Sequence, residues 1–220
     1  MTNVFVDTVL LTYGALFPIV NPVGSAPLFL GLTQFCTYKQ RNWLARRVAL
    51  NSVCLLIGSF LIGSHVLEFF GLSLPVVRIG GGAVVTAFGW KLLNSDERPD
   101  GERDAQKDTS PIPDPFYPLT MPLTVGPGSI SVAIALGSQR PRGADLDHLS
   151  EFAQFGSATL VGLLAIALTV WFCYRFAERT VAALGKTGTN VVVRLSAFIM
   201  LCIGLEILWG GWSALNAAAH

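Results

Sequence analysis

Charge is scarce in this sequence. Only 13% of its 220 residues are Asp, Glu, Lys or Arg, while 52% are hydrophobic, and the mean hydropathy is +0.55. Soluble domains carry about 25% charged residues, so this composition indicates an integral membrane protein. The formal net charge is +1, and the basic residues lie in short flanks between apolar segments. No basic face is formed, and we expect no nucleic-acid partner.

Cysteine is also rare, and the sequence lacks patterns typical of catalysis. The four cysteines are widely spaced, without a C-x-x-C pair, and three of them lie in apolar runs, where thiols usually behave as small hydrophobes. Metal-ligand spacing, a Ser/His/Asp pattern and a phosphate-binding glycine loop are all missing. We therefore expect no metal, no cofactor and no enzymatic activity.

Six apolar segments are long enough to cross a membrane, which takes about 20 helical residues. They cover residues 4–32, 48–70, 72–93, 118–136, 152–176 and 191–215. The first lacks a basic n-region and a cleavage site, so we interpret it as a retained span. A polar stretch rich in acids and proline begins at Asn94 and cannot bury itself. The predicted organisation is a three-helix repeat over 1–93, a cytoplasmic loop over 94–117 and a second three-helix repeat over 118–220.

The first and fourth segments are interrupted in similar ways. Residues 20–27 read Val-Asn-Pro-Val-Gly-Ser-Ala-Pro, and residues 118–129 contain Pro118, Pro122 and Gly-Pro-Gly-Ser. Proline removes a backbone donor and glycine loosens the chain, so each span is expected to break, the first restarting near Ser25. Because each half has an odd number of spans, the two halves form an inverted repeat. The predicted fold is all-α, with six transmembrane helices of which helices 1 and 4 are broken.

The distribution of Lys and Arg predicts the orientation. Eleven of these residues fall in or beside the connections after the first, third and fifth segments, whereas Arg140 and Arg142 stand on the other side. Arg78 and Arg194 lie within spans and are not counted. By the positive-inside rule, the central loop is cytoplasmic and both termini are periplasmic or extracellular.

The two breaks are the predicted substrate site. A helix that restarts inside the membrane presents free N–H groups and the positive end of its dipole, and these bind an anionic group such as a carboxylate. Ser25 and Ser129 are expected to be N-caps and ligand contacts. The full set of candidates is Asn21, Gly24, Ser25, Thr124, Gly126, Gly128 and Ser129. The alternative is that both breaks are kinks repaired by neighbouring helices.

Ionisable residues within spans are candidates for coupling or gating, because they are costly in lipid and usually face a cavity. They are His65, Glu68, Arg78 and Glu206. His65 and Glu68 are three apart on one helix face and could form a pair that takes up and releases a proton. Arg78 is expected to pair with Glu206 or Glu68. Alternatively, Glu68 and Arg78 reach the outer interface.

Glycine is concentrated at residues 80–82. Small residues let one membrane helix approach another closely, and they also let it slide. Close packing of the third segment is the favoured interpretation.

The sequence resembles the MarC family of bacterial and archaeal inner-membrane proteins over nearly its whole length. The resemblance rests on residues 19–24 with 27–30, on Arg-Ile-Gly-Gly-Gly at 78–82, and on Pro118-Leu119, Pro122 and 126–130. Gly80 stands where alanine is expected in the family pattern. The resemblance implies a six-span plasma-membrane protein, distantly similar to LysE-type amino-acid exporters.

Together these features predict a secondary transporter of small neutral amino acids such as glycine or alanine, with alternating access and proton coupling. Its expected partners are this substrate and membrane lipid, and a homo-oligomer is compatible with the sequence. The alternative is a channel for small neutral solutes. The breaks loosely resemble those of aquaporins, although here they lie within the first and fourth segments. A membrane enzyme is a third, weaker alternative.

Overall fold

The computed structural model describes residues 4–94, 112–138 and 146–218, and these ranges contain only helices, turns and irregular segments. The helices are α1 (Val4–Val20), α2 (Pro22–Leu32), α3 (Tyr38–Phe69), α4 (Leu74–Leu93), α5 (Pro127–Ser138), α6 (Leu146–Arg175) and α7 (Ala177–Ala218). The prediction of an all-α protein is confirmed. Most of the central loop, residues 95–111, lies outside the described ranges, as do Arg140 and Arg142.

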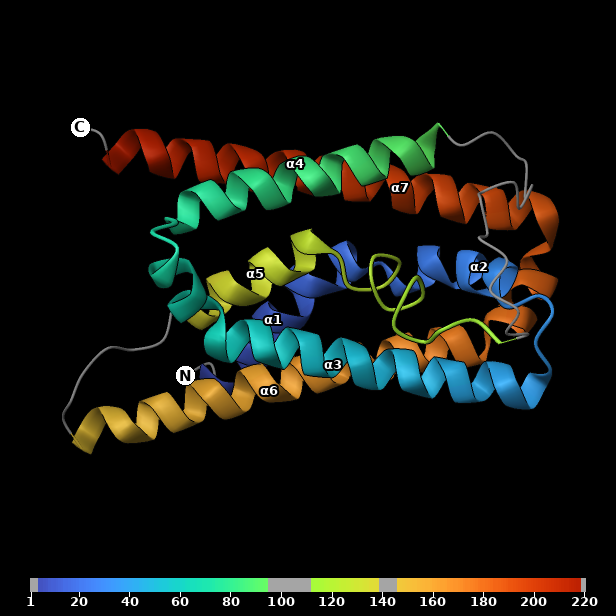
Figure 1. Cartoon of the computed structure of the whole chain (residues 1–220), viewed down its shortest axis with the longest axis horizontal. Helices are drawn as coiled ribbons and strands as arrows, with labels where there is room; N and C mark the ends of the chain where they lie inside the picture. Colours follow the sequence, from blue (N-terminus) through green and yellow to red (C-terminus); the bar gives the residue numbers. More distant parts are fainter. Residues whose placement is uncertain (1–3, 95–111, 139–145, 219–220) are drawn as a thin grey trace.

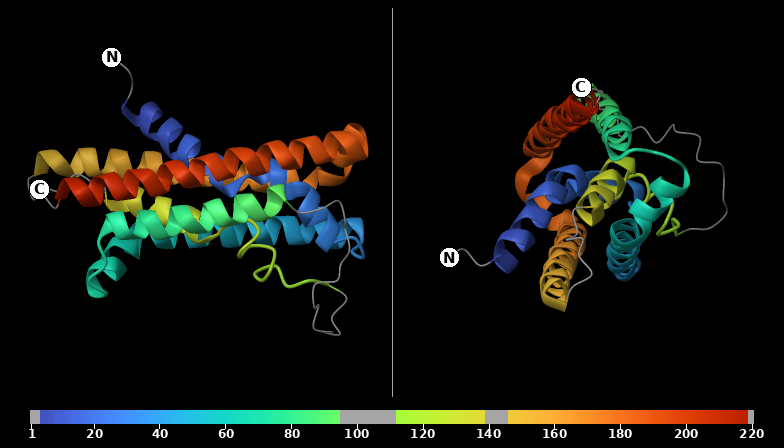
Figure 2. Two further views of the ribbon diagram at one scale, coloured as in Figure 1. Left: turned by 90° about the horizontal axis from the view of Figure 1, so that it is seen from above. Right: turned by 90° about the vertical axis from the view of Figure 1, so that its left-hand side faces the viewer.

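The helices form three layers (Figures 1 and 2). α4 and α7 pack side by side as one outer layer, and α3 packs against α6 on the opposite side. α1, α2 and α5 lie between them: α1 contacts α6, α2 contacts α7, and α5 contacts both α3 and α4. The interrupted segments therefore occupy the middle of the molecule.

Four helical stretches are long and apolar enough to cross a membrane, namely Tyr38–Phe69, Leu74–Leu93, Ala153–Arg175 and Thr187–Ala217. α1 and α2 meet at a bend of 40° and make a fifth span if they are counted as one. α5 is apolar but shorter, with 12 residues. Within the described ranges, the six predicted segments thus appear as four spans, one bent pair and one short helix.

The second predicted broken helix is only half helical. Residues 112–126 form turns and irregular chain, and regular helix begins at Pro127. The physical reason is the proline density, because Pro115, Pro118 and Pro122 each lack an N–H group to continue a helix. Wide turns take the place of a regular helix here. In one of them Val125 N donates a hydrogen bond to Thr120 O, five residues back, at 2.8 Å. The prediction of a helix on both sides of this break is wrong.

A short repeat explains how this segment satisfies its carbonyl groups. The tripeptide Pro-Leu-Thr occurs at 118–120 and again at 122–124. In each copy the threonine hydroxyl donates to the carbonyl five residues back: Thr120 to Pro115 O and Thr124 to Leu119 O, both at 2.7 Å. Side-chain hydroxyls thus supply donors that proline removes.

Several helices begin earlier than the apolar pattern predicts. α3 begins at Tyr38, ten residues before the second apolar segment, because Thr37 and Gln40 form a capping box. α7 begins at Ala177, and Gly185 interrupts it with φ of 66° and ψ of −179°, a conformation open to glycine. Polar helix turns therefore extend the spans beyond the apolar core.

Glycine brings α4 and α7 into close contact. A Cβ atom on Gly82 would lie 2.6 Å from Leu208 N, and one on Gly89 would lie 2.7 Å from Leu201 N. A Cβ on Gly204 would lie 2.5 Å from Thr86 N. Only glycine permits this distance between the helix backbones. The close packing predicted for residues 80–82 is confirmed at Gly82.

Polar contacts tie the start of α3 to the junction of α6 and α7. Arg41 Nη1 lies 2.8 Å from Glu178 Oε2, and Arg41 Nη2 donates to Thr33 O at 3.1 Å, at the end of α2. Next to it, Arg175 Nη1 donates to Asn42 Oδ1 at 2.6 Å. This end of the bundle also carries Lys39 and the other basic residues near the α2–α3 turn. We call it the basic end.

Candidate functional site

The first break is built on Asn21. Its backbone adopts a left-handed conformation, with φ of 47° and ψ of 56°, and it is the only described residue other than glycine with a positive φ. Asparagine tolerates this region better than most residues. Its N–H donates to Phe17 O at 2.9 Å, while its own carbonyl accepts from Ser25 N at 2.9 Å. The chain therefore bends at Asn21 with few backbone hydrogen bonds lost.

Asn21 is also the N-cap of α2. Its Oδ1 accepts from Gly24 N at 3.1 Å, and Pro22, with its fixed φ, follows as the first helical residue. The helix thus restarts three residues before Ser25, and the prediction that Ser25 is the N-cap is wrong. An asparagine before a proline was the sequence signal for this cap.

The side-chain amide nitrogen of Asn21 makes no hydrogen bond to any described residue. Asn21 is buried, with 7% of its surface exposed, and its Nδ2 atom has no hydrogen-bond partner among the described residues. A buried, unpaired amide costs about 1–3 kcal/mol. Because the Asn21 carboxamide already engages Gly24 N, the free donor at this helix terminus is the side chain rather than the Gly24 backbone. The arrangement can donate hydrogen bonds to an acceptor placed beside α2.

Gly24 brings α7 against this break. A Cβ atom on Gly24 would lie 2.5 Å from Asn21 Nδ2 and 2.7 Å from Ser196 Cβ. The absence of a side chain at Gly24 therefore leaves room for Asn21 and Ser196 on its two sides. Ser196 was missed by sequence reasoning, since a lone serine in a long apolar run carries no distinctive signal.

The two breaks meet through hydroxyl groups. Ser25 Oγ donates to Leu123 O across a distance of 3.4 Å, which joins α2 to the irregular segment. Thr124 Oγ1 lies 2.7 Å from Tyr174 Oη of α6. Since the Thr124 proton is directed to Leu119 O, the Tyr174 hydroxyl is the donor to Thr124. The structure thus brings Ser25 and Thr124 into one polar cluster.

Tyr174 is the centre of that cluster. It is fully buried, and its ring stacks on Phe29 of α2 at a centroid distance of 4.4 Å. The sequence analysis did not identify Tyr174, because it lies 50 residues beyond Thr124 in an apolar segment without a break. Tyr174 connects α2, α6 and the second break.

We expect Tyr174→Phe to weaken the contact between the two breaks while retaining the ring stacking on Phe29. Loss of the donated hydrogen bond should reduce the free energy of unfolding by about 0.5–1.5 kcal/mol. A double-mutant cycle with Thr124→Val should give a coupling energy of similar size, measured by thermal unfolding in detergent. Tyr38→Phe at an exposed position is the matched control. Purely additive effects of the two substitutions would contradict a direct bond.

Gly128 of the second break faces a different helix from the one that Gly24 faces. A Cβ atom on Gly128 would collide with Val85 of α4, whereas Gly24 faces α7. Ser129 Oγ donates to Gly126 O at 2.9 Å from inside the first turn of α5, so Ser129 is not an N-cap either. Gly24 and Gly128 therefore do not face each other, and the two breaks meet at Ser25, Leu123 and Thr124.

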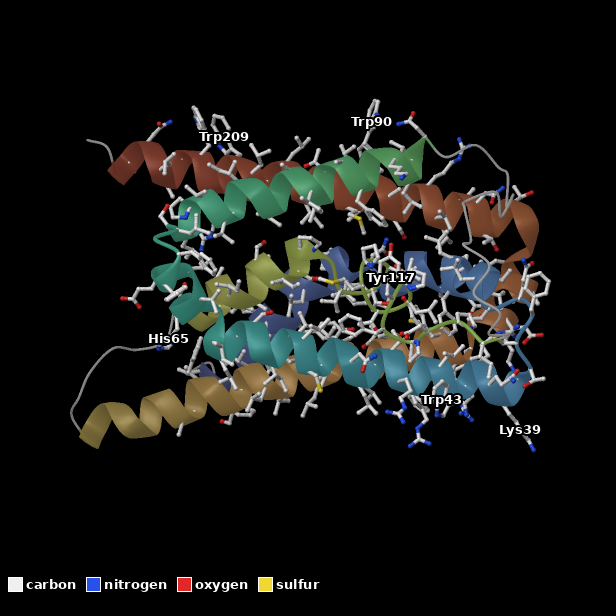
Figure 3. The ribbon with its side chains drawn as sticks, in the orientation of Figure 1. Lys39, Trp43, His65, Trp90, Tyr117 and Trp209 are labelled. Atoms are coloured by element: carbon white, nitrogen blue, oxygen red, sulfur yellow. The ribbon has the colours of Figure 1, made fainter. Side chains whose placement is uncertain are left out.

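The predicted coupling residues lie apart. His65 and Glu68 are exposed on the last turns of α3, and His65 lies at the end of the bundle opposite Lys39 (Figure 3). Arg78 is half-buried and lies one turn before Gly81, which packs against α5. Among the described side chains no ion pair joins His65 to Glu68.

The expected ion pair of Arg78 with Glu206 or Glu68 is not formed. The ion pair found among the described side chains joins Arg41 to Glu178. Gly204 and Leu208 both contact Gly82 of α4, so Glu206, midway between them on the helix, faces the opposite way. Glu206 is accordingly exposed. Helix rotation, which the sequence alone did not determine, separates the two charges.

Comparison with known proteins gives a consistent result. The model of the family described as "MarC family integral membrane protein" matches residues 6–215. The "UPF0056 inner membrane protein MarC" of Salmonella typhimurium is 28% identical over an alignment of 204 residues that covers 89% of this chain and 90% of that protein. The "UPF0056 membrane protein YhcE" of Escherichia coli is 29% identical over 198 residues, 89% of this chain and 87% of that protein. No solved structure matches the chain.

Proposed function

The chain belongs to the MarC family of integral membrane proteins, and from its two interrupted segments we propose that it is a secondary transporter of small neutral amino acids. The observation that carries the proposal is Asn21, a buried side chain with an unpaired donor at a helix break. Polar residues inside a membrane protein are expensive and usually functional. The paired breaks are the feature that transporters use to bind substrates.

An inverted repeat supports alternating access. α2 follows the first break and packs on α7, while α5 follows the second break and packs on α4. Two further contacts, α3 with α6 and α4 with α7, join corresponding helices of the two proposed halves. The chain also reverses direction at each successive element from α1–α2 through α7 (Figure 1). These relations fit two three-helix halves with α1–α2 and α5 as their discontinuous members.

We place the protein in the inner membrane, as the name of the Salmonella relative states for that protein. The basic end, with Lys39, Arg41 and Arg175, would face the cytoplasm under the positive-inside rule. The start of α1 and the end of α7 lie at the other end of the bundle (Figure 1), which would be periplasmic.

The break suits a small zwitterion. A carboxylate would accept hydrogen bonds from Asn21 Nδ2 beside the positive end of the α2 dipole. Hydroxyl groups of Ser25 and Thr124, together with the Leu123 carbonyl, provide acceptors for an ammonium group. The second break would contribute Gly126, Gly128 and Ser129 by backbone packing rather than by a shared cavity with Gly24.

The decisive experiment is counterflow in proteoliposomes. Vesicles holding purified protein and unlabelled glycine or alanine should accumulate the labelled amino acid, with saturable uptake. An imposed pH gradient tests proton coupling, for which His65 and Glu68 remain candidate groups. Flux without saturation or counterflow would indicate a channel, and an absence of exchange for every small neutral amino acid would refute the proposal.

A further inference from the structure

Ser196 of α7 lies across Gly24 from the unpaired amide of Asn21. A Cβ atom on Gly24 would lie 2.5 Å from Asn21 Nδ2 and 2.7 Å from Ser196 Cβ. Both distances are measured from one point, and hydrogen bonds of these groups are about 2.7–3.0 Å long. The Asn21 amide and the Ser196 side chain are therefore close enough for one carboxylate group to contact both.

The hydroxyl group of Ser196 makes no hydrogen bond to any described residue. A hydroxyl in a helix often donates to a carbonyl of the preceding turn, as Thr189 of α7 does to Gly185 O at 2.7 Å. Ser196 lacks such a bond and is half-buried. Asn21 is buried, with 7% of its surface exposed, and its Nδ2 atom has no partner among the described residues. Two unused donors from different helices therefore converge beside Gly24.

An apolar cluster lies next to these two donors. Met200 follows Ser196 by one turn on the same face of α7. It belongs to one buried cluster with Ile19 of α1, two residues before Asn21, and with Val85 of α4. These side chains offer no hydrogen bonds to a polar ligand side chain. Sites for small molecules commonly combine such an apolar wall with a few convergent polar groups.

We infer that Ser196 is a substrate-binding residue and donates to the same carboxylate as Asn21. The inference rests on the transport function proposed above and extends its site from α2 to α7. A carboxylate has two oxygens, so Asn21 Nδ2 can donate to one and the Ser196 hydroxyl to the other. Hydrogen bonds to a charged acceptor are roughly twice as strong as bonds between neutral groups. The apolar cluster restricts the ligand class to amino acids whose side chain is hydrogen or aliphatic.

Ser196→Ala tests this role because it removes only the hydroxyl group. In the counterflow assay it should raise the KM for labelled alanine about 10-fold or more, while the maximal rate stays near that of the wild type. Loss of uniform binding has this effect, whereas a purely structural role would change the melting temperature and not the KM. Ser213→Ala, at an exposed position near the end of α7, is the matched control and should leave the KM unchanged.

A second measurement does not depend on transport. Ser196→Cys introduces a thiol beside Gly24, and its labelling by N-ethylmaleimide is followed by mass spectrometry of the purified protein. Alanine at a concentration well above its KM should slow this labelling severalfold, because bound substrate would cover the thiol. Ser213→Cys should react at the same rate with and without alanine.

The two measurements separate this inference from the proposed function. Wild-type protein that exchanges alanine, together with an unchanged KM for Ser196→Ala and no protection of Ser196→Cys, would overturn the inference and leave the transport function intact. A change in melting temperature alone would indicate a bridging water molecule at Ser196 and would overturn it too. Protection without counterflow would support binding at Ser196 and refute transport. Absence of both protection and counterflow would overturn the two proposals together.

Discussion

Gly82→Ala is expected to destabilise the protein, whereas Gly80→Ala is not. The Cβ atom added at Gly82 would lie 2.6 Å from Leu208 N and 2.8 Å from Gly204 O, and both are backbone atoms that no rotamer change can move. α4 and α7 would have to separate along their whole contact. We expect the free energy of unfolding to fall by about 1–3 kcal/mol, measured by thermal unfolding of the purified protein in detergent.

Gly80→Ala is the matched control, because it makes the same chemical change two residues earlier on the same helix. Gly80 is exposed, and the position of its Cβ has no atom within 4 Å. Alanine favours helix over glycine by about 0.8–1.0 kcal/mol, so this variant should be neutral or slightly stabilised. Equal melting temperatures of the two variants would show that α4 and α7 are not in backbone contact.

Asn21→Gly is expected to abolish most transport while leaving the fold intact. Glycine adopts the left-handed conformation of Asn21 freely and costs only a few tenths of a kcal/mol as an N-cap, so the bend between α1 and α2 should persist. The variant removes the unpaired Nδ2 donor. Loss of a hydrogen bond to a substrate carboxylate, about 1.5–3 kcal/mol, should lower the ratio of maximal rate to KM about 10- to 150-fold.

Thr37→Gly is the control for this prediction. Thr37 is the N-cap of α3, is exposed, and lies outside the polar cluster at the breaks, so its loss should have a comparable small effect on stability and none on transport. Asn21→Gly protein that melts normally and transports at the wild-type rate would show that Asn21 is only a structural cap. The proposed substrate site would then be wrong.

The polar cluster at the two breaks was predicted only in part from the sequence. The sequence identified Asn21, Ser25 and Thr124 because proline and glycine at membrane depth expose backbone groups that polar side chains must satisfy. It did not identify Tyr174 or Ser196. Each is far from the breaks along the chain, and only the packing of α6 and α7 against the middle layer brings it there.

For the ionisable residues, the sequence predicted their location in the spans correctly but not their pairing. Composition and hydropathy placed Arg78 and Glu206 within spans, and both do lie in helices that can cross a membrane. Their pairing failed because a rotation of α7 by half a turn exchanges the inner and outer faces of the helix. That rotation is determined by the glycine contacts with α4, which long-range packing alone decides.

By itself, the sequence determined that this is an all-helical membrane protein of the MarC family, where its apolar segments lie, and that two of them are interrupted. These properties depend on local composition and on the loss of backbone donors at proline. The tertiary structure decided that Asn21 caps α2, that the breaks meet through Ser25, Thr124 and Tyr174, and that Glu206 faces outward. Such relations depend on the rotation and contact of helices that are distant in the chain, and a pattern along the sequence does not specify them.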